Sequence, residues 1–194
     1  MTGRPSTLEE RLRARGDWLG ASCVPLVDET RFVFAARIDG DVVEISGVGG
    51  KVEPGETFRD AAEREFREET GGDIRIAALE RGDRLGISVD DVPVPSGAAA
   101  LIITRKPAGA RLYIAVFAGW IDRLPRPVEK VTHFCLVPPH WSGRDFDGVQ
   151  VVDEIGLRPG RDAFAGRAPR LVDTAKAVVS AALLTRWRDV LSRG

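Results

Sequence analysis

The segment 50–71 constrains this chain more than any other, because a glycine-rich stretch runs directly into a charged stretch that ends at two glycines. The spacing predicts a helix over 56–70, and a glycine pair is a natural helix C-terminus. On a helix that turns about 100° per residue, Glu65 and Glu69 fall inside the apolar stripe, and Glu68 falls at its edge. The stripe consists of Phe58, Ala61, Ala62 and Phe66. This helix therefore directs carboxylates toward the side that should be buried.

Clustered carboxylates in such a place need a cation. They repel one another and lose hydration on burial, which raises their pKa values unless positive charge holds them. Carboxylate oxygens at this spacing suit a hard divalent ion such as Mg²⁺. The glycine-rich turn lets backbone approach a ligand closely, and a helix N-terminus favours a phosphate. The alternative is a solvated acidic face with i,i+4 ion pairs such as Arg64–Glu68, and the phase of the helix alone leaves both open.

The same residues resemble the Nudix box, whose pattern is Gly, five residues, Glu, seven residues, Arg-Glu, an aliphatic, any residue, Glu-Glu, any residue, Gly and an aliphatic. The positions that match the fixed part of this pattern are Gly50, Glu56, Arg64, Glu65, Glu68, Glu69 and Gly71. At roughly one in fifteen per position, a chance match of all of them is about one in 10⁸ per starting point. Phe66 and Gly72 stand where the pattern has aliphatic residues, and both changes affect packing rather than the acidic positions.

The resemblance implies an α/β fold, the Nudix α/β/α sandwich with a mixed β-sheet, and an enzyme that hydrolyses a nucleoside diphosphate linked to another group. It also implies Mg²⁺ or Mn²⁺ as cofactor and a metal-bound water that attacks phosphorus. The metal ligands carried over by position are Glu65, Glu68, Glu69 and the carbonyl of Gly49. Arg64 would orient the acidic cluster, and Glu56 would support the loop and the helix start. Lys51, with Gly50 and Glu56, would bind substrate, and a solvated loop lysine is an equal alternative for Lys51.

The general base varies within the family and is often a carboxylate on a loop just before a strand. Glu129 sits in such a place and is the predicted base, with Glu65 as its competitor. Weaker candidates are Asp153, Glu154 and His133. A lone histidine in a strand is more often structural. A zinc cluster of His133, Cys135 and His140 fits no usual ligand spacing.

The nature of the substrate stays open at this point, because no subfamily marker for ADP-ribose, dinucleoside polyphosphates or coenzyme A is found near the box. Aromatic side chains that could stack on a base are Trp120, Phe134, Trp141 and Phe146. Packing is the more usual role of such residues. The alternative function is a catalytically silent Nudix-like module that binds or senses a nucleotide. The intact acidic set favours the enzyme.

Apolar runs predict strands on both sides of the helix at 56–70. The expected strands are two within 24–38, joined by a turn at 28–30, and further ones at 42–46, 74–79, 101–104, 112–121 and 131–137, the last of the chain. A turn is expected at 39–41, and a glycine-rich turn is expected between 47 and 55. Further helices are expected at 7–18 and 171–191.

A length of 194 residues favours one domain over 1–194. Within it we expect an N-terminal helical segment at 1–20, an irregular excursion or lid at 138–170, and a C-terminal helix at 171–192. The predicted buried stripe of that helix is Leu171, Ala175, Val178, Val179, Ala182 and Leu183.

Charge and composition narrow the partners. The chain has 28 Lys plus Arg and 29 Asp plus Glu, a net charge of −1, so no nucleic-acid or anionic-membrane partner is expected. Two cysteines are too few for a disulfide framework. No apolar leader or membrane-length run is seen, so a cytoplasmic protein is expected. The expected partner is a small-molecule nucleotide. A homodimer is possible, since dimers are common in the family that the sequence resembles.

Overall fold

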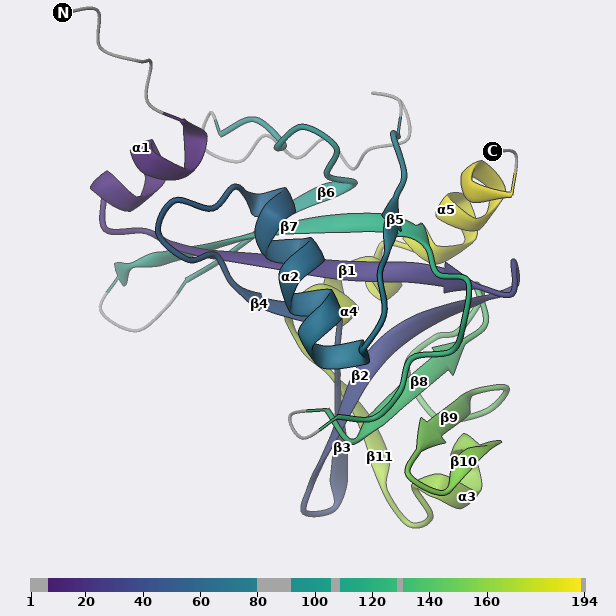
Figure 1. The fold of residues 1–194 in the computed structure, drawn as a ribbon. Coiled ribbons are helices and arrows are strands. Elements are labelled where there is room, and N and C mark those ends of the chain that lie inside the picture. Colours follow the sequence, from purple (N-terminus) through teal and green to yellow (C-terminus); the bar gives the residue numbers. More distant parts are fainter. Residues whose placement is uncertain (1–6, 80–91, 106–108, 129–130, 193–194) are drawn as a thin grey trace, which may run out of the picture.

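A computed structural model describes residues 7–79, 92–105, 109–128 and 131–192 (Figure 1). The helices in this part are α1 (Leu8–Ala14), α2 (Phe58–Thr70), α3 (Gly160–Ala163), α4 (Asp173–Ser180) and α5 (Leu183–Leu191). The strands are β1 (Trp18–Val27), β2 (Arg31–Asp39), β3 (Val42–Ser46), β4 (Val48–Lys51), β5 (Arg75–Ile76), β6 (Ala100–Arg105), β7 (Arg111–Trp120), β8 (His133–Val137), β9 (Gln150–Asp153), β10 (Gly156–Pro159) and β11 (Ala168–Leu171).

These strands are connected in one sheet whose main path is β10-β9-β8-β2-β1-β7-β5. β1 is parallel to β7 from Trp18↔Leu112 to Leu26↔Trp120, and β11 is parallel to β3. The other strand pairs of the described residues are antiparallel, including β1 with both β2 and β4. The expected mixed sheet is therefore confirmed.

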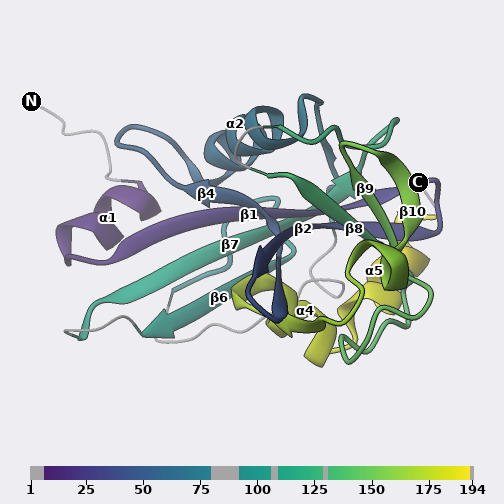
Figure 2. The same cartoon turned by 90° about the horizontal axis from the view of Figure 1, so that it is seen from below.

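Helices cover both faces of this sheet, as Figure 2 shows, with α2 on one side and α4 and α5 on the other. Leu12 of α1 joins Phe58 and Phe66 of α2 in one buried cluster. Trp187 of α5 is fully buried in a second cluster, with Val178 of α4. Because side chains alternate across a strand, each long strand supplies both clusters. The expected α/β/α arrangement is confirmed.

The N-terminal boundary differs from the expected helix at 7–18. The helix α1 ends at Ala14, and Gly16 follows in the left-handed region at φ 80°. Trp18 then opens β1, a ten-residue central strand instead of the short one expected from residue 24. Gly20 and its neighbours have weak intrinsic strand preference, and they are strand here because they pair with β4 and β7 at once.

The glycine cluster also differs from the expected turn. Residues 48–51 form β4, which pairs antiparallel with β1 from Gly20↔Lys51 to Cys23↔Val48. The connecting loop to α2 is therefore shorter than expected and spans 52–57. The expected turn at 28–30 is confirmed, with Asp28 and Glu29 both at positive φ. The strand expected at 74–79 is reduced to β5.

The segment 138–170 was expected to be an irregular excursion or lid, but it forms regular elements. It contains β9 and β10, which extend the sheet beyond β8, then α3 and most of β11. β8 is consequently not the last strand. Short four-residue strands separated by Asp, Gly and Pro carry little periodicity, so the pattern in the sequence does not reveal them.

The C-terminal helix expected at 171–192 is two helices. Ala182 lies between α4 and α5 with φ 52° and ψ 31°, a left-handed conformation that interrupts the helix. The side chain of Ala182, expected in the buried stripe, is exposed, and Trp187 takes the central buried place. No helix in the described part of the chain is long and apolar enough to cross a membrane.

Candidate active site

The helix α2 begins and ends where its sequence dictates. Thr57 is its N-cap and forms a reciprocal capping box with Asp60, and Gly71 ends it in the left-handed conformation at φ 66°. Burial of Phe58 and Phe66 fixes the rotation of the helix against the sheet.

That rotation brings two carboxylates against the backbone of β4. The backbone N–H of Gly49 donates to Oε2 of Glu69 at 2.9 Å. A Cβ placed on Gly50 would lie 2.5 Å from Cδ of Glu65, so the carboxylate occupies the space that any other residue would fill. The structure thus assembles Glu65, Glu69, Gly49 and Gly50 in one place.

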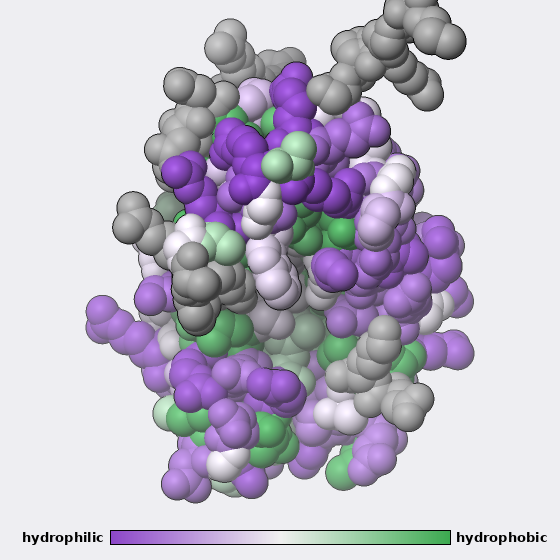
Figure 3. All heavy atoms as spheres, turned by 90° about the vertical axis from the view of Figure 1, so that its left-hand side faces the viewer, coloured by the Kyte–Doolittle hydropathy of each residue, from purple (hydrophilic) through white to green (hydrophobic). Residues whose placement is uncertain are grey.

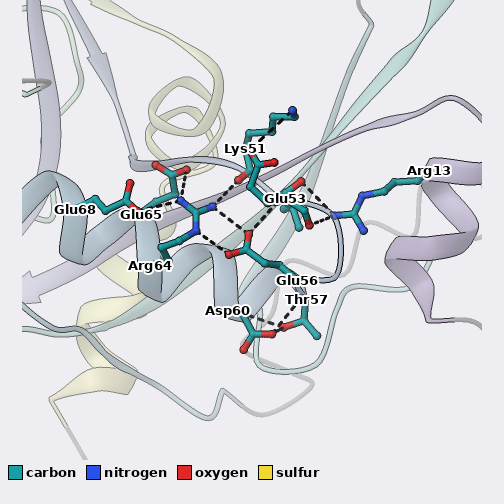
Figure 4. A network of polar contacts seen from close by, with 10 residues as sticks. Arg13, Lys51, Glu53, Glu56, Thr57, Asp60, Arg64, Glu65 and Glu68 are labelled. Atoms are coloured by element: carbon teal, nitrogen blue, oxygen red, sulfur yellow. Dashed lines mark hydrogen bonds and ion pairs between the residues drawn. The ribbon is translucent and has the colours of Figure 1, made fainter.

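Arg64 organises the carboxylates around it (Figure 4). Its guanidinium donates from Nε to Oε1 of Glu56 at 2.7 Å and from Nη2 to Oε2 of Glu56 at 3.0 Å. Nη1 donates to Oε1 of Glu65 at 2.8 Å and lies 3.5 Å from Oε1 of Glu68. Nη2 also donates to the carbonyl of Lys51 at 3.0 Å. One cation therefore connects α2 with β4 and the loop between them.

The pKa values of this ion pair follow from its hydrogen bonds. The Arg64 guanidinium holds the pKa of the Glu56 carboxyl below its usual range, against the opposing effect of burial. Glu56 and then Glu65 raise the pKa of Arg64 further above its already high value. Both groups are thus charged throughout the neutral range.

The three acids of α2 that the sequence predicts as metal ligands differ in exposure. The side chain of Glu65 is only 13% exposed, whereas that of Glu68 is 44% exposed. Glu69 is half-buried. Glu65 and Glu69 therefore define the inner part of the cluster, and Glu68 lies at its solvent edge.

The chemistry of this cluster fits a hard divalent cation. Carboxylate oxygens are the ligands that such a cation prefers, and the guanidinium of Arg64 draws three carboxylates together. Within the described ranges, no three His, Cys, Asp or Glu side chains surround one point closely enough to hold an ion. An ion would therefore draw Glu68 and Glu69 inward by side-chain rotation.

Lys51 does not face the acids of α2. Its side chain is 67% exposed, and its ammonium lies 3.9 Å from Oε1 of Glu53. Figure 4 shows its side chain directed away from Glu65 and Glu68. The structure places only its backbone in the cluster, through the carbonyl that accepts from Arg64.

A cavity of about 360 Å³ lies against β4, whose residues separate it from the acids of α2. It shares Gly49, Gly50 and Lys51 with the carboxylate site and is walled by Thr174 of α4. Its remaining lining consists of Trp18, Leu19, Gly20, Ala21, Ser22, Ser46, Gly47, Leu112 and Ile114. Figure 3, which faces the end of the molecule where β1 and β7 begin, shows a hollow with neutral and hydrophobic residues in its floor.

Trp18 is the aromatic side chain of this cavity, and sequence reasoning missed it. It is 58% exposed at the mouth, whereas Phe134, Trp141 and Phe146 are buried in the cores. Trp120 donates from Nε1 to the carbonyl of Leu191, away from the cavity. Trp18 was assigned to a helix, and only its pairing with Leu112 reveals its place.

Of the other predicted candidates, Glu129 is outside the residues that the structure describes, and the remaining ones lie away from the cluster. Asp153 is buried and accepts from Arg158 at 2.6 and 2.9 Å, so its carboxylate is engaged in the β9–β10 hairpin. Glu154 beside it is exposed.

His133 behaves as a structural residue. Burial lowers the pKa of its imidazole, and its ring lies 5.5 Å from that of Phe164. Cys135 is fully buried and His140 is exposed, and they form no metal-holding group with it among the described residues.

Comparison with known proteins identifies the family of this chain. Residues 17–140 match the model of the NUDIX domain family. A NUDIX-family hydrolase from Clostridium perfringens is similar in structure, with 13% identity, a TM-score of 0.51, and coverage of 85% of this chain and 95% of that chain. No curated protein matches the chain.

Two further solved structures show a weaker likeness. The MutT protein from Methanosarcina mazei Go1 has 16% identity and a TM-score of 0.46, with 63% of this chain and 77% of that chain covered. The dihydroneopterin triphosphate pyrophosphohydrolase of E. coli has 19% identity and a TM-score of 0.44, with 62% and 80% covered. At these scores neither likeness bears on the substrate.

Proposed function

Because the chain belongs to the Nudix family of hydrolases, we propose that it is a Mg²⁺-dependent pyrophosphohydrolase that cleaves a nucleoside diphosphate linked to another group. Mn²⁺ would serve in place of Mg²⁺. The observation that carries the proposal is the convergence of Glu65 and Glu69 on β4, beside an open cavity that shares Gly49 and Gly50 with them.

The residues that would hold the divalent ion are Glu65, Glu68, Glu69 and the carbonyl of Gly49. Bound there, such an ion would neutralise diphosphate charge and lower the pKa of a water ligand. Arg64 keeps one oxygen of Glu65 occupied, which leaves the other to face the ion or the attacking water. The half-buried Glu69 is held in reach by the N–H of Gly49.

The attacking water must lose a proton before or as it adds to phosphorus. Glu129 remains the proposed acceptor, and Glu65 is the alternative because its carboxylate already lies in the cluster. Glu129→Gln would lower kcat by about 10²-fold if Glu129 accepts the proton. An unchanged kcat in this variant would transfer the role to Glu65.

The cavity beside β4 would accept the nucleoside part of the substrate. The residues of its floor are small and uncharged, and Trp18 at its mouth offers a ring face on which a base could stack. Gly50 and the backbone of Lys51 would lie between this cavity and the metal, where the diphosphate must pass. The exposed ammonium of Lys51 could turn from Glu53 to a phosphate oxygen.

A panel of nucleotides tests the proposal: nucleoside triphosphates, oxidised nucleoside triphosphates, nucleotide sugars, ADP-ribose and dinucleoside polyphosphates, each assayed for products with Mg²⁺. We expect release of nucleoside monophosphate from at least one compound, and loss of turnover with EDTA, Glu68→Gln or Glu69→Gln. Glu63→Gln is the matched control, since Glu63 pairs with Arg59. Tight binding without turnover would instead identify a silent nucleotide-binding module.

A further inference from the structure

The short helix α1 holds the loop that carries the carboxylate network, although nothing in the Nudix box includes it (Figure 4). We propose that Arg13 of α1 is a positioning residue that acts through this loop on the orientation of Glu65. The proposal rests on the proposed function, because Glu65 matters there as a metal ligand.

The contact is made by one nitrogen of Arg13. Nη2 donates to the carbonyl of Glu53 at 2.6 Å and to the carbonyl of Val52 at 3.1 Å. Both carbonyls belong to the loop 52–57 between β4 and α2. Hydrogen bonds from a charged donor are short and directional, so this pair fixes where the loop lies.

From that loop a continuous series of hydrogen bonds leads to the metal-binding acids. The N–H of Glu53 donates to Oε2 of Glu56 at 2.9 Å. Glu56 in turn accepts from Arg64 through both oxygens, and Arg64 donates to Glu65 at 2.8 Å. Each member orients the next, so a change at Arg13 reaches Glu65 through three side chains or peptide groups.

A second residue of α1 anchors the same region from the other side. Oε1 of Glu9 accepts the N–H of Phe58 at 3.0 Å, at the first residue of α2. Glu9 is only 7% exposed. The dipole of α2 favours a carboxylate at the N-terminus of that helix. Leu12 is buried in the cluster that contains Phe58. The helix α1 is therefore fixed on α2, and Arg13 has a rigid base.

The physical expectation is a change in metal affinity rather than in folding. Residues that orient metal ligands from outside the first layer typically alter affinity or activity by about 10- to 100-fold. Arg13 contacts two carbonyls of a partly exposed loop, so its loss removes few buried contacts.

The test compares Arg13→Ala with Arg11→Ala, which removes the same charge from an exposed site of the same helix. We expect Arg13→Ala to raise the dissociation constant for Mn²⁺, measured by electron paramagnetic resonance, by about tenfold and to lower kcat by a similar factor. The Nε–H resonance of Arg64 should move in Arg13→Ala. Arg11→Ala should match wild type in all three, and Arg13→Lys, which keeps a charged donor, should recover most of the loss.

A double-mutant cycle separates this role from general stabilisation. Glu56→Gln interrupts the series, so adding Arg13→Ala to it should leave Mn²⁺ affinity at the value of Glu56→Gln alone. Equal Mn²⁺ affinity and an unmoved Arg64 resonance in Arg13→Ala would overturn the proposal, as would full additivity of the two substitutions. If wild type bound no Mn²⁺ and hydrolysed nothing, the proposed function would fail, and the Arg64 resonance would still decide whether Arg13 controls the network.

Discussion

A glycine is needed at position 50 because the side chain of Glu65 fills the space that a Cβ would occupy. Gly50 is in β4, and Glu65 of α2 fills the space above it, with all three carboxyl atoms 2.5–2.7 Å from an added Cβ. A side chain there must displace the carboxylate, because the backbone of β4 is held by its pairing with β1.

Gly50→Ala should therefore lower kcat by about 10²-fold, the usual effect of misplacing a catalytic group by about 1 Å. Circular dichroism would verify that the fold persists. Gly72→Ala serves as control, since its added Cβ would lie 3.7 Å from the nearest atom, Oγ1 of Thr70. Full activity of Gly50→Ala would show that the observed place of Glu65 is not needed for turnover.

The ion pair of Glu56 and Arg64 makes stability depend on pH. The pKa of Glu56 is lower in the folded protein than in an unfolded chain, so its contribution is complete above about pH 5 and is lost as pH falls through its folded pKa. Urea denaturation between pH 3 and 6 should show a steeper loss for wild type than for Glu56→Gln, by at most about 1.4 kcal/mol per pH unit. Parallel curves would contradict the assignment.

At the residue scale, the sequence predicts the orientation of the acids of α2 well, but it does not predict which residues from other elements contact their loop. The 100° rotation per residue places Glu65 and Glu69 toward the sheet, and both do lie against β4. It also places Glu68 at the edge of the apolar stripe, and Glu68 lies at the solvent edge of the cluster. It gives no sign of Glu9 or Arg13, because their partners lie 49 and 40 residues away along the chain.

At the scale of elements, pairing between strands determines secondary structure where the local sequence has no clear preference. The strand β4 consists of a Val, two Gly and a Lys, residues with a weak strand preference as a set. It forms because its backbone pairs with that of β1. The C-terminal end of α2 was predicted from its glycine pair, whereas its start lies two residues after the expected residue 56, because Thr57 caps the helix. The break between α4 and α5 was not predicted, since Ala182 belongs to the best helix-forming type.

The left-handed conformation of Ala182 lowers the stability of the fold, and a glycine at this position would remove that strain. Its φ of 52° disfavours a Cβ, so Ala182→Gly should raise the free energy of unfolding by roughly 0.5–1 kcal/mol. The neighbouring Ala181 has φ −89°, and Ala181→Gly should lower it by up to about 1 kcal/mol. Urea denaturation of both variants provides the measurement. Destabilisation by both would show that α4 and α5 are joined differently.

For the whole molecule, two hydrophobic layers hold the helices to opposite faces of one sheet. Trp187 is the largest fully buried side chain of the layer under α4 and α5. Its two helices lie in the last fifth of the chain, where the sequence predicted a single helix with a different stripe, and they pack on residues of the sheet such as Phe32 and Phe34. The α/β/α sandwich with its mixed sheet could be expected from the family resemblance, whereas the contribution of 138–170 to the sheet could not.

Trp187→Ala should therefore lower the free energy of unfolding by about 3–5 kcal/mol, because it leaves a large cavity in a closed core. Trp18→Ala removes the same kind of side chain from the exposed mouth of the cavity and should change it by no more than about 0.5 kcal/mol. Both values come from urea denaturation. A loss below 1 kcal/mol for Trp187→Ala would mean that α5 is not part of the folded core.

The proposed function requires that α2 and β4 together hold a divalent cation beside the cavity. A crystal soaked in Mn²⁺, with anomalous difference density recorded near the manganese edge, shows whether they do. We expect a peak bounded by the carboxylates of Glu65 and Glu69 and the carbonyl of Gly49, with Glu68 turned inward. Density only elsewhere, with Glu69 still bound to the N–H of Gly49, would contradict it.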